Sequence, residues 1–79
     1  MGPMDEEGRR AAEAVRGAVA RGDGDALRLL LHPYLHWTLE DGTVLRGRRN
    51  VLAMLEQAAP PDPPTDVELR DGQVYRWVP

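Results

Sequence analysis

Residues 34–46 read YLHWTLEDGTVLR, and this stretch decides the fold class. Its first half alternates polar residues with apolar ones, at Leu35, Trp37 and Leu39. This is the period of a β-strand with one buried face. The dipeptide Asp41-Gly42 is typical of a two-residue hairpin turn, which would pair Leu39 with Val44 and Trp37 with Arg46. We therefore predict a β-hairpin whose apolar face carries Leu35, Trp37, Leu39, Val44 and Arg46.

A second hairpin is predicted over residues 66–78, DVELRDGQVYRWV, where the turn dipeptide recurs as Asp71-Gly72. A two-residue turn would pair Leu69 with Val74. The residues of one face are then Val67, Leu69, Val74 and Arg76. The residues of the other face are Asp66, Glu68, Tyr75 and Trp77.

Three helices are predicted around these hairpins. The first spans residues 6–21, ends at Gly22 and has a narrow apolar stripe of Ala11, Ala12, Val15, Ala18 and Val19. The second is capped by Asp23 or Asp25 and ends at Leu31 or His32, because Pro33 follows; its inner face is Leu27, Leu30 and Leu31. The third begins after Gly47 and covers residues 48–58, with Val51, Leu52, Met54 and Leu55 as its apolar positions.

The segment 59–65 is rich in proline and is expected to be an extended connector. Residues 1–5 are expected to be frayed. The order helix, helix, hairpin, helix, hairpin (ααββαββ) predicts one α+β domain over residues 1–79, with three helices packed on an antiparallel sheet made of two hairpins.

Composition excludes several function classes. The chain has no cysteine and no serine, which removes thiol chemistry and serine-centred hydrolysis. Its net charge is −3 with no basic half, so no nucleic-acid partner is expected. No apolar run is long enough to span a bilayer, which favours a cytoplasmic protein. Every basic residue is arginine, which indicates codons of a GC-rich bacterium.

Three short motifs favour structural roles. Asp23 and Asp25 lack the further oxygen ligands of a calcium site and are interpreted as helix caps. His32 and His36 have zinc-ligand spacing, but Pro33 between them prevents helical geometry. No metal or cofactor is therefore expected. The cluster Arg46, Arg48 and Arg49 is interpreted as a solvated helix start, with a phosphate site as the alternative.

A family resemblance rests on the order of several short motifs. They are Ala20-Arg21-Gly22-Asp23, Ala26-Leu27, Pro33, Trp37, Gly42 and Leu45-Arg46-Gly47-Arg48, followed by Val51 and Leu55. Over residues 11–57 this order resembles the front half of SnoaL-like proteins of the nuclear-transport-factor-2-like (NTF2-like) superfamily.

The resemblance implies a cone-shaped α+β domain. The superfamily includes polyketide cyclases, ketosteroid isomerases, epoxide hydrolases and members without known catalysis, so the fold leaves the activity open. Only about twenty residues follow the third predicted helix, fewer than the resemblance implies, so we expect a C-terminally shortened cone. No catalytic residue of the family is carried over.

The candidate catalytic residues are Glu40, His36 and Tyr34, with Asp41 in the turn. They would supply a carboxylate base and a proton-transfer partner. Strand alternation places His36 and Glu40 opposite Trp37, away from the apolar face, although a one-residue bulge would reverse this facing.

The candidate ligand-binding residues are Trp37 and Leu39 as a wall, and Arg46 or Arg76 as an anchor for a carboxylate or phosphate. The alternative is that both arginines extend to solvent with their stems packed on the sheet.

The candidate interface residues are Tyr75 and Trp77, which are predicted on a face that also carries charge. A homodimer would cover them. The alternative is that Trp77 folds over the end of the sheet. The sequence thus favours a self-associating module that binds a small hydrophobic or anionic ligand, with an enzyme that uses a carboxylate base as the alternative.

Overall fold

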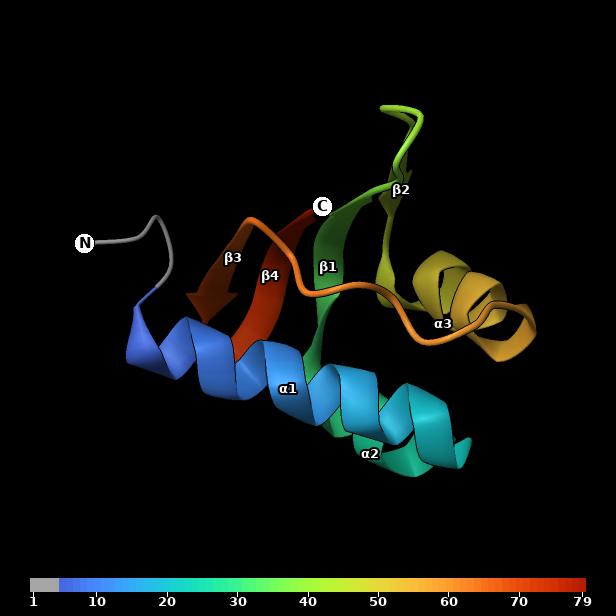
Figure 1. The fold of residues 1–79 in the computed structure, drawn as a ribbon, viewed down its shortest axis with the longest axis horizontal. Coiled ribbons are helices and arrows are strands. Elements are labelled where there is room, and N and C mark those ends of the chain that lie inside the picture. Colours follow the sequence, from blue (N-terminus) through green and yellow to red (C-terminus); the bar gives the residue numbers. More distant parts are fainter. Residues whose placement is uncertain (1–4) are drawn as a thin grey trace.

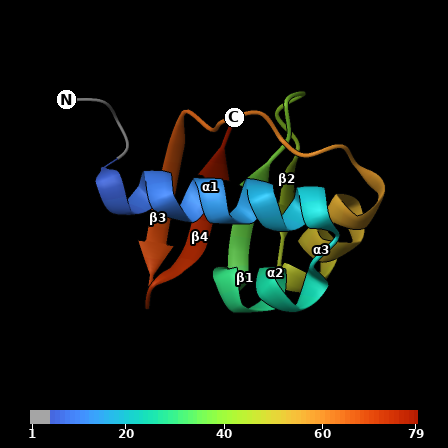
Figure 2. The ribbon, with the colours of Figure 1, turned by 60° about the horizontal axis from the view of Figure 1, so that its bottom comes forward.

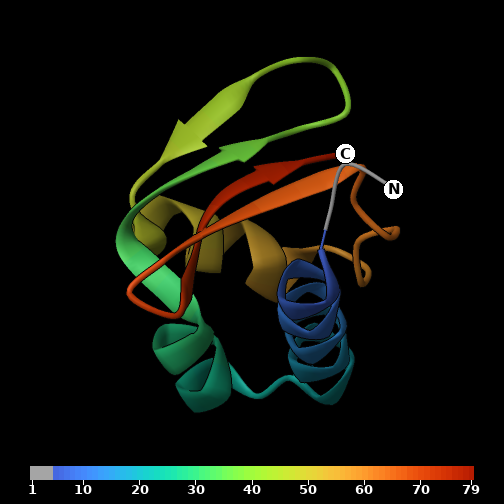
Figure 3. The same cartoon turned by 90° about the vertical axis from the view of Figure 1, so that its left-hand side faces the viewer.

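Residues 5–79 are described by a computed structural model, in which three helices lie on one face of a four-stranded sheet (Figures 1 and 3). The elements are α1 (Glu6–Arg21), α2 (Gly24–Leu30), β1 (Leu31–Thr38), β2 (Val44–Arg46), α3 (Arg48–Gln57), β3 (Asp66–Arg70) and β4 (Gln73–Val78). This order confirms the predicted α+β class. None of the helices in the described part of the chain is long and apolar enough to cross a membrane.

The helix ends follow their capping residues. Asp5 accepts a hydrogen bond from the Gly8 N–H at 2.7 Å, so it caps α1. The prediction that Asp5 is frayed is therefore wrong, and residues 1–4 of that prediction lie outside the described residues. Gly22 ends α1 in the left-handed conformation at φ 67°, and Asp23 caps α2 by accepting from the Ala26 N–H.

The sheet is mixed, with strand order β2-β1-β4-β3. Each hairpin is antiparallel, as predicted, but β1 and β4 pair in parallel. The prediction of a wholly antiparallel sheet is wrong because α3 and the connector carry the chain to the edge strand β3, after which β4 turns back beside β1 and runs in the same direction (Figure 2). The central position suits β4, whose Val74 and Trp77 are both buried.

Strand β1 begins three residues earlier than predicted, at Leu31, and passes through Pro33. Its register with β4 shifts between Leu31, which pairs with Val74, and His36, which pairs with Arg76. Pro33 lies in this irregular stretch, where a missing N–H breaks no regular ladder. A proline ends a helix but does not exclude a bulged strand, which explains the misplaced boundary.

The register of the first hairpin differs by one residue from the predicted register. Thr38 pairs with Val44 and Trp37 with Leu45. The Leu39 N–H donates to the Thr43 carbonyl at 2.7 Å, and the Gly42 N–H donates back to the Leu39 carbonyl at 2.9 Å. Glu40 therefore joins the loop, and Gly42 adopts φ 91°. Since directly opposed residues share a face, Val44 and Arg46 lie on the face opposite Trp37.

The second hairpin has the predicted two-residue turn, with Asp71 and Gly72 both at positive φ. A bulge follows at Tyr75, so that Leu69 pairs with Val74 but Val67 pairs with Trp77. The predicted facing of Trp77 is therefore wrong: it joins Val67 on the buried face and is 2% exposed.

The core lies between the sheet and the helices. Its fully buried larger side chains are Val15, Leu31, Leu35, Val51, Val74 and Trp77. Trp37 and Trp77 stack at the centre, with ring centroids 4.3 Å apart and planes at 7°. This pair is the largest apolar unit in the fold.

Candidate functional site

A cleft opens beside the tryptophan stack, where the end of β1, helix α3 and the connector meet. We name it the tryptophan cleft; its volume is about 150 Å³ and its lining residues are Trp37, Thr38, Leu39, Glu40, Met54, Leu55, Ala58, Ala59, Pro61, Asp62, Trp77 and Pro79. Most of these side chains are apolar. The ionisable side chains in the lining are the carboxylates of Glu40 and Asp62.

The connector forms one wall of the cleft and is held at both ends. The Arg16 Nε of α1 donates to the Pro61 carbonyl at 2.8 Å. At the other end, the Thr65 hydroxyl donates to the Pro79 carbonyl and the Thr65 N–H to the Val78 carbonyl, both at 2.9 Å. These contacts order a segment that has no helix or strand hydrogen bonds of its own.

The cleft contains two of the four predicted ligand-binding residues, Trp37 and Leu39. Arg46 and Arg76 are exposed. They lie opposite His36 on the two strands that flank β1, on the face of the sheet that the helices leave uncovered. The predicted placement of these arginines beside Trp37 is therefore wrong, because the longer first loop and the Tyr75 bulge each reverse a facing. The rim of the cleft carries carboxylates in place of guanidinium groups.

Of the predicted catalytic residues, only Glu40 lies at the cleft. His36 and Tyr34 lie with Tyr75 on the uncovered face, as strand alternation predicted for His36. Asp41 is fully exposed in the loop, where the Thr43 N–H and hydroxyl hold the pKa of its carboxyl below the ordinary value. The structure therefore does not bring a histidine and a carboxylate together at the cleft.

Tyr75 belongs to an aromatic cluster on the uncovered face. Its ring meets His32 and His36 edge to face, at centroid distances of 5.1 and 5.5 Å, and Arg70 lies over it at 4.1 Å. The Tyr34 N–H donates to Nδ1 of His32, which places the proton of a neutral His32 on Nε2. Trp77, the other predicted interface residue, is in the core and not in this cluster.

Sequence reasoning missed Asp62 and Met54 as cleft residues. Asp62 lies between prolines in the connector. Nothing in its local sequence indicates that the hydrogen bond from Arg16 to Pro61 holds the connector beside the cleft. The sequence predicts Met54 as an apolar position of the third helix, but periodicity does not distinguish a residue that fills the core from one that lines an opening.

Comparison with known proteins identifies the fold. No family model and no curated protein matches the sequence. Solved structures do match, and the chain has an NTF2-like fold, as the resemblance implied.

Three structures illustrate the match. A candidate ketosteroid isomerase from Kribbella flavida is 17% identical, with a TM-score of 0.73 over 92% of this chain and 76% of its own. An LEH-like epoxide hydrolase from M. tuberculosis is 18% identical, with a TM-score of 0.68 over 91% and 80%. An NTF2-like protein of unknown function from Burkholderia xenovorans is 20% identical, with a TM-score of 0.66 over 92% and 80%.

Proposed function

We propose that this chain binds a small apolar molecule, about the size of one ring, in the tryptophan cleft. The observation that supports this proposal is the opening of about 150 Å³ that is lined by the stacked indoles of Trp37 and Trp77. A cavity of about this volume accommodates benzene in other proteins. The carboxylates of Glu40 and Asp62 at the rim favour a ligand that presents a hydrogen-bond donor or a cation and oppose an anionic one.

Probes of equal size test the proposal. We expect benzylamine to shift the indole N–H resonances of Trp37 and Trp77 saturably, and benzoate to bind at least tenfold more weakly because the rim repels its charge. The double variant Glu40→Gln, Asp62→Asn should abolish this preference. Glu68→Gln removes one carboxylate from the exposed part of β3 and serves as the control. Equal binding of benzylamine and benzoate to the native protein would contradict the proposed ligand class.

A second candidate function is catalysis, favoured by the position of Glu40 at the cleft and by the two enzyme assignments among the fold neighbours. In such a reaction Glu40 would accept a proton from water as the water oxygen bonds to an epoxide carbon and the ring C–O bond breaks. The protonated Glu40 would then return that proton to the alkoxide oxygen, and the product would be a diol. We expect Glu40→Gln to abolish any hydration of styrene oxide while neutral toluene still binds. His36→Ala should leave that turnover unchanged, since His36 lies across the sheet from the cleft; a loss with His36→Ala would contradict this assignment.

Self-association stays a prediction. The surface that now supports it is the uncovered sheet face, where Tyr34 is 74% exposed beside the Tyr75 cluster and Val44 is 46% exposed. Tyr75 keeps its predicted interface role as part of this proposal. The buried Trp77 does not support a role as an exposed anchor.

A further inference from the structure

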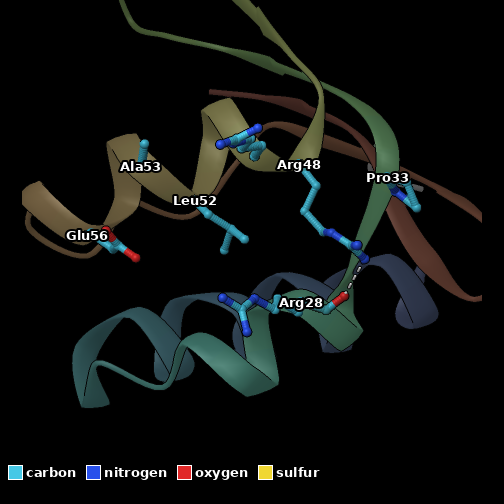
Figure 4. A pocket seen from close by; sticks show the side chains of 7 residues that line it. Arg28, Pro33, Arg48, Leu52, Ala53 and Glu56 are labelled. Atoms are coloured by element: carbon cyan, nitrogen blue, oxygen red, sulfur yellow. Dashed lines mark hydrogen bonds between the residues drawn. The ribbon is translucent and has the colours of Figure 1, made fainter.

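A second opening, between α2 and α3, gathers three arginines. Its volume is about 480 Å³, and its lining residues are Arg28, Pro33, Arg48, Arg49, Leu52, Ala53 and Glu56. We name it the arginine groove. It shares no lining residue with the tryptophan cleft, because it uses the opposite side of α3. Figure 4 shows Arg48 reaching from the start of α3 to the backbone carbonyl of Arg28 on α2, with the Arg28 side chain extending along α2.

The three arginines of the groove are only partly balanced by acidic residues, Asp25 beside Arg28 and Glu56 at the far end of the lining. Arg48 and Arg49 are the first residues of α3, whose first turn has no acid and whose cap Gly47 supplies no side-chain hydrogen bond. A helix N-terminus itself has a partial positive charge, so cations there are unfavourable. Among residues 5–79, the ion pairs include none with Arg48 or Arg49, and Arg28 is paired only with Asp25, which is 95% exposed. A protein of net charge −3 therefore concentrates positive charge at one groove.

Arg48 is already ordered for binding. Its Nη1 donates to the Arg28 backbone carbonyl at 2.9 Å, and its side chain is half-buried (Figure 4). This contact uses one of five guanidinium N–H groups, so the others remain for an acceptor. A side chain that is fixed in advance loses less conformational entropy when a ligand binds.

Beyond the arginines the groove becomes apolar. Leu52 and Glu56 also line an adjoining cavity of about 260 Å³, whose other residues include the buried Leu27 and Leu55. The two openings thus meet along one side of α3. Glu56 lies about 12 Å along the helix axis from Arg48, since each residue of an α-helix adds about 1.5 Å.

We propose that the arginine groove binds an amphiphile with a single oxyanion head, a carboxylate or a phosphate, and a short apolar tail. The head lies among Arg28, Arg48 and Arg49, whose planar guanidinium groups match such an anion bidentately. The tail lies over Leu52 toward the adjoining cavity. Glu56 repels a second anionic group at the tail end.

Calorimetric titration of the native protein tests the head and the tail separately. We expect hexyl phosphate and hexanoate to bind saturably, and their relative affinity identifies the preferred head. Hexanol, which lacks the anion, and inorganic phosphate, which lacks the tail, should each bind at least tenfold more weakly than hexyl phosphate. Absence of saturable binding of both anionic probes, or binding of hexanol or inorganic phosphate as tight as that of hexyl phosphate, would overturn the proposal.

Variants then locate the site. Arg49→Gln removes an exposed guanidinium and is expected to raise the Kd of hexyl phosphate about tenfold, because a charge-assisted hydrogen bond is lost. Arg9→Gln makes the same charge change on the exposed side of α1 and should alter the Kd less than twofold. Circular dichroism checks that both variants are folded. Equal weakening by the two variants would show attraction by overall charge alone and would overturn the site.

Glu56→Gln tests the far end of the groove. We expect it to strengthen the binding of adipate, which has a carboxylate at each end, more than the binding of hexanoate, whose single carboxylate lies among the arginines. An unchanged affinity for adipate would contradict the orientation proposed for the tail.

Discussion

Trp77→Ala is expected to lower the stability of the fold by about 3–5 kcal/mol. Trp77 is 2% exposed, and its ring stacks on that of Trp37 at 4.3 Å. Truncation of a buried tryptophan to alanine costs about 3–5 kcal/mol. A domain of 79 residues has a total free energy of unfolding of about 4–12 kcal/mol, so the loss ranges from about a quarter of the stability to all of it.

Urea denaturation followed by circular dichroism measures this loss. Trp77→Phe keeps a ring against Trp37 and should cost clearly less than Trp77→Ala. Tyr75→Ala, two residues away on the same strand, should cost about 1 kcal/mol or less, because Tyr75 is only half-buried and packs on Arg70. A Trp77→Ala variant as stable as Tyr75→Ala would contradict the buried position of Trp77.

Helix positions were predictable because each helix has both its apolar period and its end signals within the helix itself. Gly22 ends α1, Asp23 caps α2, and Gly47 precedes α3, as predicted, whereas the cap at Asp5 was not predicted. These signals act within four residues of the backbone groups that they satisfy. The observed helix ends therefore differ from the predicted ones by at most two residues, and the largest difference is at the end of α2, which is Leu30.

Strand facing was less predictable, and the two Asp-Gly turns show why. At Asp71-Gly72 both residues adopt positive φ and close the expected two-residue turn. At Asp41-Gly42 only Gly42 has positive φ, and the loop takes in Glu40. The two forms differ by one residue of register, which reverses every later side chain. The dipeptide alone does not choose between them.

The candidate site depended on these registers. Trp37 and Leu39 precede the first turn and were placed correctly, whereas Arg46 follows it and Arg76 follows the bulge at Tyr75. Tyr75 meets His32 and His36, which lie far from it in the sequence. A bulge stabilised by such distant contacts leaves little local signal.

Gly47→Ala is expected to destabilise the fold by about 1–3 kcal/mol. Gly47 adopts φ 89° and ψ 141°, close to a region that only glycine occupies readily. Space is not the obstacle, because an added Cβ would lie 3.9 Å from the Pro33 carbonyl oxygen, an ordinary contact. The cost arises from the backbone. The Gly47 N–H donates to the Leu35 carbonyl at 2.9 Å, so relief of the strain would break the link between β1 and α3.

Gly24→Ala is the matched control. Gly24 is the first residue of α2, its φ is not positive and an added Cβ would meet nothing within 4 Å. Alanine there should leave the stability unchanged or raise it by up to about 1 kcal/mol, since it lowers the entropy of the unfolded chain. Urea midpoints of the two variants should therefore move in opposite directions, or only that of Gly47→Ala should fall.

The same substitution links stability to both proposed sites. Helix α3 supplies Met54 and Leu55 to the tryptophan cleft and Leu52 to the arginine groove. A Gly47→Ala variant that remains folded must relax at the start of this helix, and a rotation there moves both linings together. We expect the affinities for benzylamine and hexyl phosphate to fall together in this variant. Loss of stability with both affinities unchanged would show that the strain is absorbed within the loop before α3.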